Sequence, residues 1–114
     1  MRDHKTSSEL ITEEVTSWPG VEAGVGSRGE FAFTVGRREI GHLHGDHVAH
    51  FGFPKDVWTE LFDQQRIDYH PVFPGRPGFG ARLIEDETDE RDVIAILRLN
   101  YERALDRHGM PATN

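Results

Sequence analysis

The amino-acid sequence predicts an α+β fold, in which helices pack on one face of an antiparallel sheet of five or six strands. Two observations lead to this prediction. Four extended segments follow one another between residues 21 and 53, and short turns join them. Apolar residues repeat at helical spacing before these segments, after them and near the end of the chain. Consecutive strands with short connections favour antiparallel pairing, so the predicted order is α-β-β-β-β-α-β-β-α.

The first helix is predicted to begin next to Thr6. Thr6 and Glu9 have the spacing of a capping box, in which each side chain accepts a hydrogen bond from the other residue's backbone N–H. The apolar residues that follow at helical spacing are Ile11, Val15 and Trp18. The Pro-Gly pair at 19–20 is typical of a helix end.

The next predicted elements are strands at residues 21–25, 30–35, 39–44 and 48–53. Phe31, Phe33 and Val35 alternate with polar or small residues, which indicates a strand with one buried face. Glycine-containing turns at 36–38 and 45–47 separate the last three strands. This run of strands forms most of the predicted sheet.

A second helix, a further strand pair and a loop are predicted between residues 54 and 85. Pro54 suits the first position of the helix. Its apolar stripe consists of Val57, Trp58, Leu61 and Phe62. Residues 67–73 have an extended pattern that is interrupted at Pro71. Residues 74–78 are predicted to be a loop, because their prolines and glycines suit neither a strand nor a helix, and 79–85 form a strand.

The last helix is the most clearly indicated element. Asp86 or Thr88 caps it, and acidic residues crowd its first turn, where the helix dipole favours negative charge. Gly109 and Pro111 end it. Its apolar face consists of Val93, Ile96, Leu97, Tyr101, Ala104 and Leu105. The predicted core of the whole domain contains Leu43, Phe51, Trp58, Leu61, Ile96, Leu97 and Tyr101.

Composition predicts one acidic domain over residues 1–114, with flexible tails at 1–6 and 109–114. The formal net charge of −7 opposes binding to nucleic acid or to an anionic membrane surface. Cysteine is absent, which excludes disulfides and thiolate metal sites and favours a cytoplasmic location. No run of about 18 apolar residues is present, so no membrane span is expected. The sequence favours no particular oligomeric state.

Two short motifs match known sites but fail a physical test. Residues 24–29 match the dinucleotide-binding pattern G-x-G-x-x-G, which needs a helix at its end. The segment 30–35 alternates like a strand instead, so we interpret the glycines as a hairpin turn. Residues 42–47 match the H-x-H-x-D-H pattern of metallo-β-lactamase-type hydrolases. Those enzymes need two packed sheets and ligands from distant loops of a much longer chain, so we reject this assignment too.

Histidines concentrate on the two strands that flank the turn at 45–47. Because side chains alternate along a strand, the register decides which of them share a face. A two-residue loop at 45–46 pairs His42 with Ala49, whereas a three-residue loop at 45–47 pairs His42 with His50. The second register separates polar from apolar residues better, so we favour it. It puts His42, His44, Val48 and His50 on one face, and Leu43, Ala49 and Phe51 on the other.

Such a cluster has several interpretations. Three imidazoles about 7 Å apart along the strands and about 5 Å across them can bind a ligand, transfer protons near neutral pH or hold zinc, iron or copper. His70 joins them if its strand neighbours the hairpin, and Asp46 can orient an imidazole. Alternation predicts that Glu39 points to the other face, so we expect no tightly held structural metal. A polar face without a specific role is the remaining interpretation.

The segment Glu39-Ile40-Gly41-His42-Leu43-His44, followed by His50 and by His70-Pro71, resembles the luciferase-domain proteins. The resemblance covers roughly residues 18–105. The family takes its name from the luciferase of luminous fungi, which oxidises a hydroxypyrone with molecular oxygen. The resemblance implies shared polar positions at His42, His44, His50 and His70. It does not imply light emission, because the fungal enzyme is longer and Ile67-Asp68-Tyr69 replaces an aromatic-rich step of the family.

The resemblance implies a site that binds or oxidises a small aromatic or hydroxylated molecule, with His42, His44, His50 and His70 as its catalytic residues. One of these histidines would serve as general base. Glu39, Tyr69 and Arg76 are predicted ligand contacts, and the loop at 74–80 is expected to cover part of a shallow pocket. No cofactor is indicated. The alternative is a non-catalytic binding or interaction module of the MmcQ/YjbR-like α+β type, which predicts a flat exposed patch instead of a concave pocket.

Overall fold

The computed structural model describes residues 5–26 and 29–111, and in them three helices and a six-stranded antiparallel sheet follow the predicted order. The helices are α1 (Ser7–Thr16), α2 (Lys55–Asp63) and α3 (Glu87–His108). The strands are β1 (Val21–Val25), β2 (Phe31–Val35), β3 (Arg38–His44), β4 (Val48–Gly52), β5 (Asp68–Tyr69) and β6 (Phe79–Leu83). The α+β prediction is confirmed. None of the described helices is long and apolar enough to cross a membrane.

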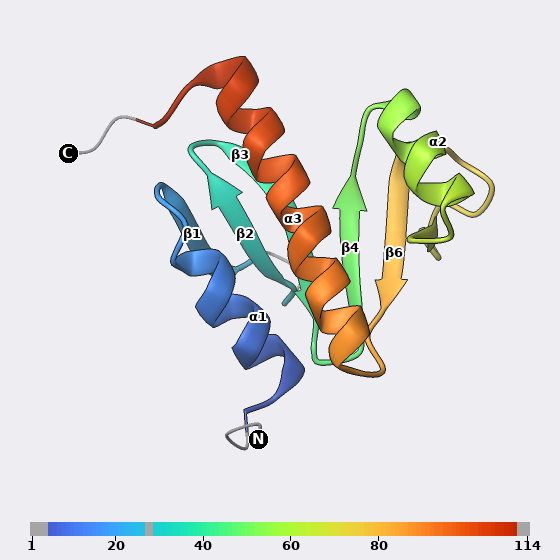
Figure 1. Cartoon of the computed structure of the whole chain (residues 1–114), viewed down its shortest axis with the longest axis horizontal. Helices are drawn as coiled ribbons and strands as arrows, with labels where there is room; N and C mark the ends of the chain where they lie inside the picture. Colours follow the sequence, from blue (N-terminus) through green and yellow to red (C-terminus); the bar gives the residue numbers. More distant parts are fainter. Residues whose placement is uncertain (1–4, 27–28, 112–114) are drawn as a thin grey trace.

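The strands lie in the order β1-β2-β3-β4-β6-β5, so β6 is inserted between β4 and the short edge strand β5. The helices pack on one face of this sheet: α3 runs across its middle, α1 lies beside α3, and α2 lies near β4 and β6 (Figure 1). We call this side the helix face. The opposite side carries His42, His44 and His50, and we call it the histidine face.

Local sequence sets the helix ends as predicted, with one correction. Thr6 and Glu9 form the capping box of α1. Asp86, rather than Thr88, caps α3 by accepting a hydrogen bond from the backbone N–H of Asp89. Pro54 is the N-cap residue of α2 and not its first helical residue, since the helix begins at Lys55. An extended backbone at Pro54, with ψ of 152°, accounts for this shift by one residue.

All seven predicted core residues are buried on the helix face. Their exposed fractions range from 0% for Ile96 and Leu97 to 5% for Trp58. Asn100 is the polar member of this interior, and its amide donates to the carbonyls of Ile40 and Gly52 on β3 and β4. A buried backbone carbonyl needs such a partner, so Asn100 ties α3 to the two strands that hold the histidines.

Strand β3 contains a bulge that shifts its side chains. Phe33 pairs with Gly41, but Thr34 pairs with Glu39, so Ile40 is an extra residue on β3 without a partner of its own on β2. Extra residues of this kind interrupt the strict alternation of a strand. Glu39 therefore lies on the same face as Thr34 and His42.

Several boundaries differ from the predicted ones. The extended segment predicted at 67–73 forms a strand only at Asp68–Tyr69, because Pro71 and the glycine- and proline-rich residues after it turn the chain away. The glycine motif at 24–29 begins within β1, and the next element after it is strand β2 and not a helix; residues 27–28 of the motif are outside the described part. Residues 1–4 and 112–114 of the predicted tails are also outside it.

Candidate functional site

The histidine hairpin has the predicted three-residue connection. His42 pairs with His50, Leu43 with Ala49 and His44 with Val48. The imidazoles of His42, His44 and His50 consequently project from one face. Their ring centroids lie 5.0 Å apart for His42–His44, 5.3 Å for His42–His50 and 4.5 Å for His44–His50. The register prediction is confirmed.

His70 joins this cluster although its strand does not adjoin the hairpin. It follows β5, and β6 lies between β5 and β4. The β6 residue that pairs with both His50 and Asp68 is Ala81. Because alanine is small, the ring of His70 reaches past it, and the centroids of the His70 and His50 rings lie 4.1 Å apart. The four predicted histidines therefore meet from β3, β4 and the segment after β5.

His50 is the buried centre of the cluster. It is 6% exposed, and neither of its ring nitrogens has a hydrogen-bond partner among the described residues. His42 and His70 are half-buried and His44 is exposed. A buried polar atom without a partner costs free energy, typically about 1–3 kcal/mol, unless a bound molecule or ion satisfies it. His50 is therefore a buried polar side chain whose hydrogen-bonding capacity the described residues leave unused.

Glu39 contradicts its predicted orientation. The sequence pattern placed its side chain on the helix face, but the bulge at Ile40 turns it to the histidine face. There one carboxylate oxygen of Glu39 lies 3.0 Å from Nδ1 of His42. A carboxylate in this position accepts a hydrogen bond from Nδ1–H and leaves the Nε2 lone pair free to act as a base or a ligand.

Three further predicted residues have other surroundings. Asp46 accepts a hydrogen bond from the backbone N–H of Ser8, so it anchors α1 to the hairpin turn instead of orienting an imidazole. The ring of Tyr69 packs against Trp58 and Phe62 on the helix face, away from the histidines. Arg76 places its guanidinium 5.6 Å from the centroid of the Phe73 ring.

An aromatic pair beside the histidines was missed by the sequence reasoning. Phe73 and Phe79 stack with ring centroids 4.5 Å apart, and His70 lies 5.4 Å from Phe73. Phe79 is 39% exposed, so part of its ring is accessible. The available indication was the position of Phe79, which opens a strand directly after the loop. The two rings form an apolar wall at one end of the histidine face.

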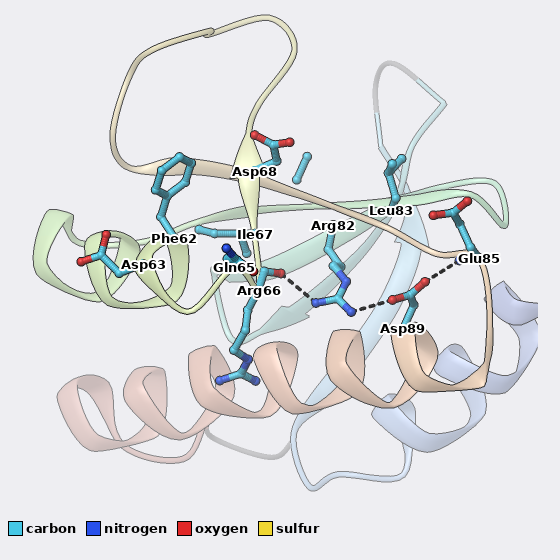
Figure 2. A pocket seen from close by; sticks show the side chains of 11 residues that line it. Phe62, Asp63, Gln65, Arg66, Ile67, Asp68, Arg82, Leu83, Glu85 and Asp89 are labelled. Atoms are coloured by element: carbon cyan, nitrogen blue, oxygen red, sulfur yellow. Dashed lines mark hydrogen bonds and ion pairs between the residues drawn. The ribbon is translucent and has the colours of Figure 1, made fainter.

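The histidine face is open, and no pocket lined by the four histidines is found among the described residues, contrary to the shallow pocket expected beneath the loop at 74–80. A concavity of about 680 Å³ lies elsewhere, along β6 near the start of α3 (Figure 2). The four histidines line neither this concavity nor the smaller ones that we found among the described residues. Figure 2 shows Arg82 donating hydrogen bonds to Asp89 and to the backbone carbonyl of Arg66. Its guanidinium also donates a hydrogen bond to Asp92, which the figure does not draw. Its charge is therefore already compensated within the protein.

Burial, and to a smaller extent the nearby imidazoles of His70, His44 and His42, together lower the pKa of His50 from 6.5 to about 4. Between these pH values the unfolded chain holds a proton at this residue that the folded protein does not. The free energy of unfolding should therefore decrease as the pH falls from 6.5 toward 4, by up to about 1.4 kcal/mol per pH unit from His50 alone. Urea unfolding of chelator-treated protein between pH 6.5 and 4 measures this decrease in the free energy of unfolding.

His50→Leu is the matched variant for this prediction, because it replaces the titrating group by an apolar side chain that suits a buried position. Its stability should depend less steeply on pH below 6.5 than that of the unchanged protein. An equal slope in both proteins would show that His50 is not the residue responsible.

Comparison with known proteins gives one assignment. No curated protein and no solved structure matches the chain. The family model described as luciferase domain matches residues 37–100, which are more than half of the chain. The matched segment begins just before Glu39, contains the four histidines and ends at Asn100, the residue that ties α3 to the histidine hairpin. The chain therefore belongs to the luciferase-domain family.

Proposed function

We propose that the histidine face binds a small hydroxylated aromatic molecule and removes a proton from its hydroxyl group. The observation that carries this proposal is the convergence of four imidazoles around the buried, unpartnered ring of His50. The rival interpretation as a solvated polar face explains neither the burial of His50 nor its lack of partners. The family's named enzyme acts on a hydroxypyrone, which is a ligand of this chemical type.

His42 is the proposed general base. Its Nδ1 lies 3.0 Å from the carboxylate of Glu39, which fixes the tautomer with the lone pair on Nε2. A proton taken from the ligand then gives an imidazolium that the same carboxylate stabilises. His50 is a weaker candidate, because a pKa near 4 makes it a poor acceptor at neutral pH. Loss of the proton makes a hydroxylated ring electron-rich, which is the form that reacts readily with molecular oxygen.

The aromatic wall supports a planar ligand. Phe79 exposes part of its ring beside His70, and Phe73 stacks behind it. Planar rings bind well by offset stacking or by edge-to-face contact with such side chains. Arg76, next to Phe73, adds a positive charge that favours the deprotonated form of the ligand.

Titration of chelator-treated, isotope-labelled protein with catechol and with a hydroxypyrone, followed by NMR, tests the proposal. We expect the ring signals of His42, His50 and His70 to shift in a saturable manner. His42→Ala should weaken binding about tenfold or more, because it removes a hydrogen-bonding partner of the ligand. His47→Ala is the matched control, since His47 is an exposed histidine of the same hairpin outside the cluster, and it should bind normally.

Equal binding by the unchanged protein, His42→Ala and His70→Ala would place the ligand elsewhere and contradict the proposal. Absence of saturable binding by the unchanged, chelator-treated protein would also contradict it.

A second candidate, a protein-interaction module, is favoured by two observations: the histidine face is open, as this alternative predicts, and apolar side chains are exposed on it or beside it. Val72, Phe79 and Leu83 are 68%, 39% and 63% exposed and lie on or beside the histidine face. Exposed apolar side chains around an open face are typical of interaction surfaces. Leu83→Ser should leave binding of catechol and the hydroxypyrone unchanged if the small-molecule proposal is right.

A further inference from the structure

We infer that His42, His44 and His50 form a binding site for one divalent transition-metal ion of the first row, with a coordination position left open to the histidine face. The inference goes beyond the proposed function: it uses the same face, but it makes His42 a metal ligand instead of a general base. It does not require the proposed ligand, because the metal site is defined by the three imidazoles alone.

The spacing of the three rings suits a single ion. One nitrogen from each of His42, His44 and His50 lies within 4.8 Å of the others. Three nitrogens bound to a tetrahedral zinc ion lie about 3.3 Å apart, given zinc–nitrogen distances of about 2.0–2.1 Å. Small side-chain rotations close this gap. His44 is exposed and has room to rotate, while the fixed β3–β4 ladder holds the three backbones in register.

Glu39 supplies the supporting interaction that such sites use. Histidine ligands usually donate their second ring N–H to a carboxylate, which fixes the ring and makes the coordinating nitrogen more basic. The contact between Glu39 and Nδ1 of His42 has this form, and it leaves Nε2 of His42 free to coordinate. Strand alternation had placed the Glu39 carboxylate on the helix face, so the sequence alone did not predict this interaction.

His50 provides an independent reason for an ion. Both of its ring nitrogens are buried and lack partners among the described residues. Coordination would satisfy one of them, and it would do so without adding a charged side chain to the interior. The donor set also selects the class of metal: three neutral imidazoles suit zinc, copper, nickel, cobalt or ferrous iron, whereas magnesium and calcium prefer oxygen ligands.

Three protein ligands leave the site open rather than closed. Closed structural zinc sites use four protein ligands, and catalytic sites commonly use three and keep a fourth position for water or substrate. The ring of His70 lies beside the three ligands, with its centroid 4.1 Å from that of His50. With an ion bound, the hydroxyl oxygen of the proposed ligand would meet the metal instead of Nε2 of His42. The two proposals therefore concern the same nitrogen and need separate experiments.

The test is metal titration of the full chain without an affinity tag, after treatment with a chelator and in the absence of any organic ligand. Calorimetry with zinc chloride measures stoichiometry and affinity, and visible absorption with cobalt chloride reports coordination by the imidazoles. We expect one equivalent to bind. His44→Ala should weaken binding at least about tenfold, and because His44 is exposed this variant should fold normally. Glu39→Gln should also weaken it about tenfold or more, since it removes the supporting carboxylate.

His47→Ala is the matched control and should bind one equivalent as tightly as the unchanged protein. Binding that is lost in His44→Ala and kept in His47→Ala would support the site. No saturable binding by the unchanged protein, or equal binding by both variants, would overturn it. Such a failure would leave the small-molecule proposal standing, because that proposal is tested in chelator-treated protein.

Discussion

Leu97→Ala is expected to destabilise the protein by roughly 2–5 kcal/mol, the range for removing a fully buried leucine side chain. Leu97 is 0% exposed and belongs to the core between α3 and the sheet. A methyl carbon of its side chain lies close to Gly41 on β3, so the cavity would open directly beneath the histidine hairpin. A domain of this size has a total stability of about 5–15 kcal/mol, so the loss would be a large share of it.

Urea unfolding followed by circular dichroism measures this effect. Leu83→Ala is the matched control, because Leu83 is 63% exposed and loses the same atoms from a solvated position. Its stability should change by less than about 0.5 kcal/mol, as is usual for surface substitutions. A change that small in Leu97→Ala would mean that α3 does not cover the sheet as described.

Gly41→Val is expected to cost roughly 1–3 kcal/mol or more, because it forces side-chain atoms into a filled core. A Cβ at Gly41 would lie 2.6 Å from a methyl carbon of Leu97 and 3.0 Å from the ring of Phe51. The backbone at Gly41 also has a φ of 159°, which other residues rarely adopt. Since the bulge at Ile40 adjoins Gly41, we expect the substitution to separate Glu39 from His42 as well.

Thermal and urea unfolding measure the stability of this variant, and the NMR signals of the His42 ring report whether Glu39 still contacts it. Gly24→Val is the matched control, because Gly24 is also a strand glycine but a Cβ there meets no atom within 4 Å. Stability of Gly41→Val within about 0.5 kcal/mol of the unchanged protein would contradict the close packing of β3 on α3.

The apolar pattern of the sequence was enough to predict the elements and the histidine register. In the hairpin, only pairing of His42 with His50 puts Leu43, Ala49 and Phe51 on one face, and burial of that face selects this register. The same reasoning predicted the core, because each of its residues lies on the apolar side of its own element.

Strand alternation could not predict the position of Glu39. The bulge adds one residue to β3, so the residues that precede it in the strand point to the face opposite to the one that alternation predicts. Gly41 was the available indication, since an isolated glycine inside a strand often marks a bulge. The contact of His70 with His50 depends on the insertion of β6 between β4 and β5 and on the small size of Ala81. Both are long-range features that no local pattern encodes. Phe73 was missed because its loop has no periodicity.

The insertion of β6 also has a consequence for the order of folding. The hairpin of His42, His44 and His50 joins residues close in sequence, so it can form early and locally. Pairing of His50 with Ala81 closes a loop that contains α2 and β5, and such long-range closure carries a larger entropic cost and comes late. Only then does His70 reach the other three. The three-histidine group is therefore a property of a local hairpin, whereas the four-histidine site exists only in the completely folded chain.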